Sequence, residues 1–412
     1  MPTTAKGWLP RLRAATEAQH DALDELPVAV ALSRGDPTPR ELATFLWIMA
    51  LLHAATERAC ADVRDETLRE LGAELRARGR AAERDLAALA DAPVESAAMR
   101  PVTAIAEAIL WRAKEDPRAL LGALYVLQGS RRGARVLADR LEAQHPGLSF
   151  FASAAEDQAG AWRRLCAALD ATDPCEASGA CELAAALFGA LIDALGALVT
   201  PPNHVRPTAM VLNNEAGAHA IVTAPRPLVA ALSAGLRCWR DFPYLEERYG
   251  ARGRCFTGSD SAWLATLAGA TEEAALTKIR WLGRLLAARG LPTLILETHV
   301  VRLVDELAAF ADAEPAALAP LAAAAQALRD DRAAHLDDAD ARALEASFAA
   351  AVGARDPFAT PALVVAAVAD ECSDHERAVS SLTDWLADEA RFGLRWSTAV
   401  LDLVDAARDR AR

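Results

Sequence analysis

Aromatic side chains are scarce in this sequence of 412 residues, since Phe, Trp and Tyr together make up 5% of it. β-Branched residues are also few, and no convincing succession of alternating apolar and polar runs can be found. Strands are enriched in those residue types and in that alternation, so the composition argues against a β-sheet. Alanine, leucine and arginine, which favour helices, are abundant instead. We therefore predict an all-α protein.

Long apolar runs are missing as well. A membrane-spanning helix needs about 18 or more apolar residues unbroken by charge, and the sequence has no such stretch. Residues 183–199 come nearest, but they contain Asp193 and suit a buried helix of a bundle better. Residues 1–7 lack the apolar segment of a secretory signal peptide. We expect a soluble, cytoplasmic protein with no membrane partner.

Positive charge is in deficit, with 44 Lys and Arg against 57 Asp and Glu and a net charge of −13. This balance argues against a nucleic-acid-binding surface, which needs clustered positive charge. The seven cysteines are scattered and form no C-x-x-C pair, so neither a zinc site nor a disulfide framework is indicated. An anionic ligand could still bind wherever a few cations are placed locally.

The length of the chain predicts two domains. A Pro-rich run at 200–207 follows a long apolar segment and marks the clearest boundary. We place a first helical domain at 1–200, a linker at 201–225 and a second helical domain, for which no motif indicates a role, at 226–412. Among the expected elements are helices at 8–26, 39–63, 118–144 and 374–410, and a loop at 27–39.

Two stretches of the first domain carry the chemistry. The first, residues 12–20, ends on His20, and the second, residues 122–137, contains Gly129 and Gly133. Glycine costs about 1 kcal/mol relative to alanine inside a helix, so these glycines need a compensating reason. Either the helix kinks there, or a flat object lies against its backbone where a Cβ would not fit. A haem ring between the His-bearing and the Gly-bearing helices would account for both stretches.

Three segments, in this order, resemble haem oxygenases, particularly the biliverdin-producing bacterial branch that accompanies bacteriophytochromes. The resemblance covers about residues 8–200. The matched positions are Leu12, Arg13, Ala15, Thr16 and His20 in the first segment, Phe45, Leu46, His53 and Glu57 in the second, and Leu124 through Gly133 in the third. The third segment departs from the motif of that branch, since Arg132 replaces an apolar residue and Ala134 replaces a glycine.

The resemblance implies a monooxygenase for which haem is both substrate and cofactor. Such an enzyme consumes O2 and electrons, supplied by a ferredoxin or a flavoprotein reductase, and yields biliverdin, carbon monoxide and iron. His20 would be the proximal iron ligand, and the helix with Gly129, Ser130 and Gly133 would be the distal wall. Further residues are expected to contact the haem or its propionates, namely Arg13, Tyr125, Arg132, Arg163 and Arg164.

Two other functions stay open on the same scaffold. The altered distal motif and the unassigned second domain allow a non-catalytic haem- or bilin-binding sensor or carrier. His53 and Glu57, four residues apart on one helix, could instead form half of a non-haem di-iron site, although no second half is evident.

Overall fold

The computed structural model describes residues 7–89, 92–142, 144–153, 158–173, 177–199, 207–353 and 356–411. Within these ranges the regular structure is helical throughout, and one isolated antiparallel bridge, between Thr208 and Ala220, is the nearest approach to a strand. The predicted all-α class is therefore confirmed. The chain divides into two compact units, Met1–Val229 and Ala230–Arg412, which are described separately.

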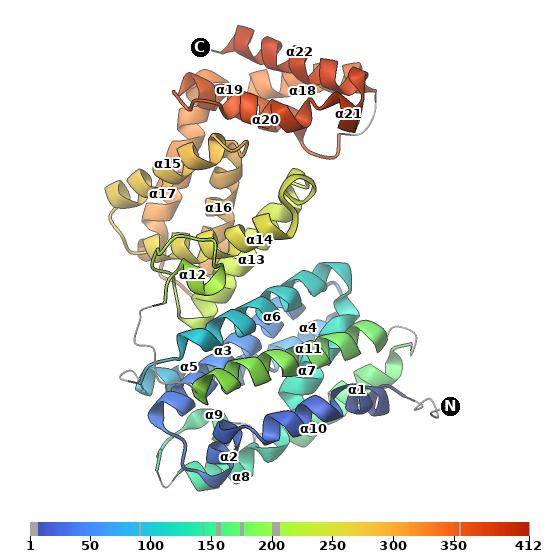
Figure 1. The fold of residues 1–412 in the computed structure, drawn as a ribbon, viewed down its shortest axis with the longest axis vertical. Helices are drawn as coiled ribbons and strands as arrows, with labels where there is room; N and C mark the ends of the chain where they lie inside the picture. The colour runs from blue at the N-terminus through green and yellow to red at the C-terminus, as the bar shows by residue number, and fades with distance from the viewer. Residues whose placement is uncertain are drawn as a thin grey trace. The chain divides into compact units, whose positions relative to one another are not determined.

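The first unit is built around two apolar helices, α3 and α11. α3 packs against α4, α5 and α6, while α11 packs against α1, α6 and α7. In Figure 1, α6, α11 and α1 run side by side across the unit. The helices of this unit are α1 (Trp8–Asp24), α2 (Pro27–Arg34), α3 (Pro39–Ala61), α4 (Glu66–Ala73), α5 (Arg76–Ala88), α6 (Ser96–Glu115), α7 (Leu120–Gly129), α8 (Arg131–Leu141), α9 (Ser149–Ser153), α10 (Gln158–Ala171), α11 (Ala177–Gly196) and α12 (Ala209–Leu212).

The N-terminus of α3 is encoded locally. The Thr38 side chain accepts a hydrogen bond from the backbone N–H of Glu41, whose carboxylate in turn accepts from the backbone N–H of Thr38. Pro39 occupies the first helical position, where no N–H is needed. From Leu42 to Cys60 almost every residue is buried. The polar residues of this helix are therefore held in the interior.

α11 is a long and strongly apolar helix. The stretch Ser178–Gly196 is long and apolar enough to cross a membrane by length and composition alone, and half of it is buried within the protein. Its packing on α1, α6 and α7 is that of a core helix in a bundle.

Two expectations about the first unit were wrong in detail. The expected loop 27–39 contains α2, which begins on Pro27 and ends at Gly35, a left-handed cap with φ 84°. The expected single helix 118–144 is preceded by a 3-10 turn and divides at Ser130 into α7 and α8. A backbone signal at each point, Pro27 and Gly35 in one case and Gly129 in the other, was present in the sequence.

The expected linker also differs from the structure. Residues 207–225 belong to the first unit, because Arg100 of α6 donates hydrogen bonds to the carbonyls of Met210 and Val211, and Trp47 Nε1 donates to Thr223 at 2.7 Å. The division between the units falls at Val229, within α13 (Pro225–Asp241). Of the sequence-predicted linker, residues 201–206 lie outside the described residues.

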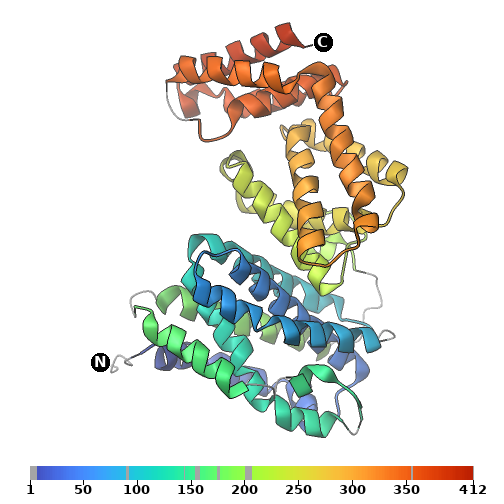
Figure 2. The same ribbon diagram turned by 180° about the vertical axis from the view of Figure 1, so that it is seen from behind.

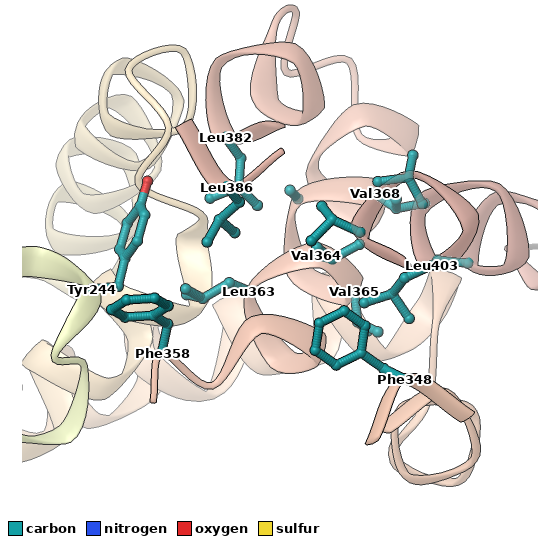
Figure 3. Packing of buried hydrophobic residues seen from close by; sticks show 14 of the residues in the cluster. Tyr244, Phe348, Phe358, Leu363, Val364, Val365, Val368, Leu382, Leu386 and Leu403 are labelled. Carbon is teal, nitrogen blue, oxygen red and sulfur yellow. The ribbon is translucent and has the colours of Figure 1, made fainter. Parts of the chain in front are cut away.

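The second unit encloses a core centred on α19. Leu363, Val364, Val365 and Val368 of this helix lie among side chains of α18, α20 and α22 (Figure 3), and α16 and α17 lie side by side as a helical hairpin (Figure 2). Its helices after α13 are α14 (Tyr244–Leu264), α15 (Glu272–Ala287), α16 (Thr293–Ala309), α17 (Pro315–His335), α18 (Asp338–Val352), α19 (Thr360–Cys372), α20 (Ala378–Leu386), α21 (Glu389–Phe392) and α22 (Leu394–Arg410). The expected single helix 374–410 is wrong, since it is broken before Ala378 and at Gly393, whose φ is 82°.

Candidate functional site

His20 lies on the exposed face of α1, with 59% of its side chain accessible. Its Nδ1 is 3.3 Å from Oδ2 of Asp24, one turn further along the helix, and its ring is tilted against Phe188 of α11 at 5.8 Å between centroids. A carboxylate beside Nδ1 favours the tautomer that carries its proton there. Nε2, which makes no hydrogen bond to the described residues, then keeps its lone pair for a metal ion.

The expected propionate partners differ in their surroundings. Arg13 of α1 and Arg163 of α10 are exposed, and within the described residues neither makes an ion pair. Arg164 instead pairs with Glu74. Arg132 lies in α8, and its side chain is outside the described residues, as are the surroundings of Gly133.

Gly129 and Gly122 of α7 illustrate two different uses of glycine. A Cβ on Gly122 would lie 2.0 Å from the carbonyl oxygen of Ala180 in α11, so close helix packing requires glycine there. A Cβ on Gly129 would meet only the Trp162 ring at 3.9 Å, an ordinary van der Waals contact. The backbone at Gly129 also has no positive φ. Side-chain packing therefore does not require glycine at position 129, which is the last residue of α7 before the break at Ser130.

Tyr125 and Trp162 cover this face of α7. Their ring centroids are 6.1 Å apart, and Trp162 projects from α10 towards Gly129. Both α10 and α11 contact α1 as well as α7. The His-bearing and Gly-bearing helices therefore share two neighbouring helices, although no described contact joins His20 itself to Gly129.

Ser130 is held by a buried arginine. Its hydroxyl donates to the carbonyl of Leu127 at 2.8 Å and accepts from Nη1 of Arg78 at 3.0 Å. Arg78 Nη1 also donates to the Leu127 carbonyl, and its guanidinium lies 4.4 Å from the Phe150 ring centroid. Within the described residues no carboxylate pairs with Arg78, and burial together with Arg131 lowers its pKa to about 9. The division between α7 and α8 is thus tied to α5.

His53 of α3 is fully buried near the same cations. Its Nδ1 faces the Met49 carbonyl at 2.7 Å, so this nitrogen carries the proton and Nε2 is left as an acceptor without a partner. Burial, followed by the charges of Arg78 and Arg131, lowers the pKa of His53 to about 3. The ring is therefore neutral at physiological pH. The amide nitrogen of Gln128 and Nε of Arg78 are likewise buried without partners, which makes this interior polar and suited to hold ordered water.

Glu57 is paired with two arginines rather than placed beside the His53 ring nitrogens. Its carboxylate accepts from Arg76 at 2.6 Å and pairs on its other oxygen with Arg226, which is buried to the same extent. Within the described part of the chain no group of three or more His, Cys, Asp or Glu side chains could hold a metal ion. The residues of the di-iron alternative thus serve as an ion pair and a buried imidazole.

Of the predicted residues, His20 lies in one group of contacts and Tyr125, Gly129 and Ser130 lie in another. One contains His20, Asp24 and Phe188, and the other contains Tyr125, Gly129 and Trp162 beside the Arg78–Ser130 contact. Sequence reasoning missed Asp24, although its spacing from His20 is a helical one that could have indicated it. It also missed Arg78 and Trp162, for which no local pattern gives a signal.

No family model, no curated protein and no solved structure matches this chain.

Proposed function

We propose that the first unit binds haem between α1 and the α7–α8 pair and cleaves it to biliverdin, carbon monoxide and iron, as a monooxygenase of the haem oxygenase type. The observation that supports this proposal best is the set of contacts that the His20 imidazole makes. An exposed imidazole whose Nδ1 faces a carboxylate and whose Nε2 has no described partner has the arrangement of an axial iron ligand.

Gly129 supports the proposal from the other side. Glycine costs about 1 kcal/mol relative to alanine inside a helix. At Gly122 close packing against α11 requires this glycine, whereas at Gly129 the described neighbours would leave room for a Cβ. The break between α7 and α8 at Ser130 is one physical reason for glycine here, and a planar ligand lying against the helix backbone is another. Trp162 and Tyr125 would border that ligand with aromatic surface.

Two cations without ion-pair partners in the described residues suit the propionates. Arg13 lies two helical turns before His20 and so on the same face of α1, and Arg163 lies one residue after Trp162 on α10. Each would bind a propionate carboxylate at the exposed edge of the ligand. Such a local cation is needed because the net charge of −13 otherwise repels an anion.

Bound haem supplies the redox chemistry, with electrons from a ferredoxin or flavoprotein reductase. The chain supplies position and hydrogen bonding. Asp24 fixes the His20 tautomer, Arg78 orients the Ser130 hydroxyl at the α7–α8 division, and the unpartnered Nε2 of His53 offers an acceptor to buried water behind it.

The test is an absorbance titration of the full chain with haemin, followed by addition of a reductant under air. We expect one haem per chain with a Soret band, then loss of that band, red absorbance of biliverdin and release of carbon monoxide. His20→Ala should abolish the axial ligation. Asp24→Asn should weaken haem binding by about 10- to 100-fold, because it removes the carboxylate that orients the ring.

The matched control is His219→Ala, which removes an exposed histidine of the same unit from a different segment. Its titration should superimpose on that of the wild type. Haemin binding that is the same in His20→Ala and wild type would exclude His20 as the ligand. Absence of any haemin binding would refute the proposed function as a whole.

One observation favours a non-catalytic haem-binding protein as the second candidate. Trp162 already lies over Gly129, on the face that a catalytic distal pocket must leave to O2 and water. A stable Soret band that persists with reductant and air, and gives no carbon monoxide, would establish this carrier or sensor in place of the enzyme.

A further inference from the structure

The second unit contains a cavity of about 330 Å³ between α15, α17 and the C-terminal end of α19. This volume is at the lower end of the range for sites that bind small molecules. Its polar lining includes Arg280, Arg284, Arg332, Asp370, Ser373 and His375. None of these residues takes part in the site proposed for the first unit.

Asp370 is a fixed, buried element of this cavity. It follows the core residues of α19 in the sequence and is 3% exposed. Its two oxygens accept from the backbone N–H and the hydroxyl of Thr293, the first residue of α16. Because α16 has no capping side chain of its own, Asp370 supplies that cap from a distant helix. This arrangement holds the carboxylate in one place.

His375 lies against this carboxylate. Its Nδ1 is 3.6 Å from Oδ1 of Asp370, and this nitrogen is buried without a hydrogen-bond partner. The residue sits in the turn between α19 and α20, where Asp374 and Arg377 both adopt left-handed conformations that are rare outside glycine. Such backbone strain persists where surrounding structure enforces it, and it recurs at binding sites. The turn therefore holds the imidazole at the cavity wall.

Some of the arginines around the cavity form ion pairs with carboxylates of the protein, and one does not within the described residues. Arg280 forms a two-pronged ion pair with Asp331 of α17. Arg332 pairs with Glu297 of α16, and His335 also lines the cavity. Arg284, by contrast, makes no ion pair or side-chain hydrogen bond within the described residues. The Ser373 hydroxyl is likewise without a described partner.

We propose that this cavity binds a small phosphate-bearing ligand, with Arg284 as the ion-pair partner and His375 and Ser373 as hydrogen-bond donors to its oxygens. Ser373 and His375 line the cavity from the end of α19 and the turn after it, and Arg284 lines it from α15. Donors from separate elements can bind different oxygens of a tetrahedral phosphate, which has more of them to offer than a planar carboxylate. A ring N–H of His375 can donate a hydrogen bond to a phosphate oxygen. Inorganic phosphate and phosphate monoesters share this chemistry.

The experiment uses the full chain and two probes, inorganic phosphate and methyl phosphate, in calorimetric titrations and in 31P line-broadening measurements. We expect saturable binding of at least one probe and a shift of the His375 ring signals in a two-dimensional NMR spectrum. Arg284→Gln should weaken binding by about tenfold or more, because a charge-assisted hydrogen bond is lost. Binding of both probes would favour free phosphate as the ligand, and binding of methyl phosphate alone would favour a phosphorylated metabolite.

Lys278→Gln is the matched control, since Lys278 is an exposed cation on the same helix α15 that does not line the cavity. It should leave phosphate affinity unchanged. His375→Asn, checked for unchanged thermal unfolding, should weaken binding without altering the fold. Equal losses in Arg284→Gln and Lys278→Gln, equal affinity for acetate, or no saturable binding of either probe would overturn the proposal.

Discussion

Gly122 and Gly129 lie on one helix, but only one of them is required to be glycine by the residues packed against it. Gly122 faces the α11 backbone at Ala180, while Gly129 faces the end of a tryptophan ring with room for a methyl group. Their spacing in the sequence is compatible with either role, and only the neighbouring helices distinguish them.

Alanine substitutions at the two glycines should therefore act in opposite directions on stability. Gly122→Ala would place its Cβ 2.0 Å from a carbonyl oxygen and should lower the free energy of unfolding by about 1–3 kcal/mol through overpacking. Gly129→Ala should raise it by about 0.5–1 kcal/mol, since alanine favours helix, yet should weaken haemin binding. Urea unfolding and haemin titration measure the two effects. Unchanged haemin affinity in Gly129→Ala would remove Gly129 from the ligand site.

His53 should make stability depend on pH in the acidic range. The pKa of His53 is about 3 in the folded protein, against an ordinary value of 6.5, so below pH 6.5 the unfolded chain binds a proton that the folded chain does not. Its contribution is fully present above pH 6.5 and is lost as the pH falls towards 3. The free energy of unfolding should decline by up to about 1.4 kcal/mol per pH unit in that window.

His53→Asn tests this pH dependence, because the asparagine amide can still donate to the Met49 carbonyl but does not titrate. Its free energy of unfolding should be lower than that of the wild type at pH 7 and should fall less steeply between pH 6.5 and 4. His299 is buried with its pKa lowered to about 4 and contributes a similar slope in the second unit. Wild type and His53→Asn are therefore compared at the unfolding transition of the first unit. If the free energy of unfolding falls equally steeply with pH in both proteins, His53 is not the group responsible.

At the scale of the element, some helix ends are capped by residues next to them in the sequence, and others are capped by residues from distant helices. The Thr38–Glu41 capping box and Pro39 start α3 from within its own sequence. α16 starts without a local side-chain cap and takes one from Asp370, 77 residues away. The α7–α8 division combines the two, since Gly129 is a local signal and the Ser130 hydroxyl accepts a hydrogen bond from Arg78, 52 residues away.

Thr38→Ala should lower the free energy of unfolding of the first unit by about 1 kcal/mol, because the backbone N–H of Glu41 loses its acceptor at the start of α3. Thr38→Ser keeps the hydroxyl and should be nearly neutral. Chemical denaturation of the three proteins side by side measures the difference. Equal stability of the alanine and serine variants would mean that α3 does not depend on this cap.

At the scale of the whole molecule, each unit has a core of its own. The second core gathers around α19, where Leu363 is completely buried, and the first around α3 and α11. Acidic side chains of the first unit, such as Glu57, are stabilised by cations brought from far along the chain, as Arg226 is from 169 residues away.

Leu363→Ala should destabilise the second unit by about 2–5 kcal/mol through the cavity it leaves. If the two cores unfold independently, calorimetry should show one transition at a lower temperature and the other unchanged, with haemin binding retained. Exposed Leu401, in α22, offers a control in Leu401→Ala, which should leave both transitions in place. A joint decrease of both transitions would show that the units unfold together.

The sequence by itself determined the helical class, the apolar character of α3 and α11 and the helical spacing of His20 from Arg13, because these depend on composition and on contacts within a few residues. It also contained the Pro and Gly signals at α2 and Gly393, whose consequences were nevertheless misjudged. Only the tertiary structure decided that Gly122 must be glycine, that Arg78 binds Ser130, that Glu57 pairs with Arg226, and that Asp370 caps α16 beside His375. Each of these results depends on two segments that are remote in sequence, and burial makes their pairing obligatory because a lone polar group or an extra methyl has no space or solvent there.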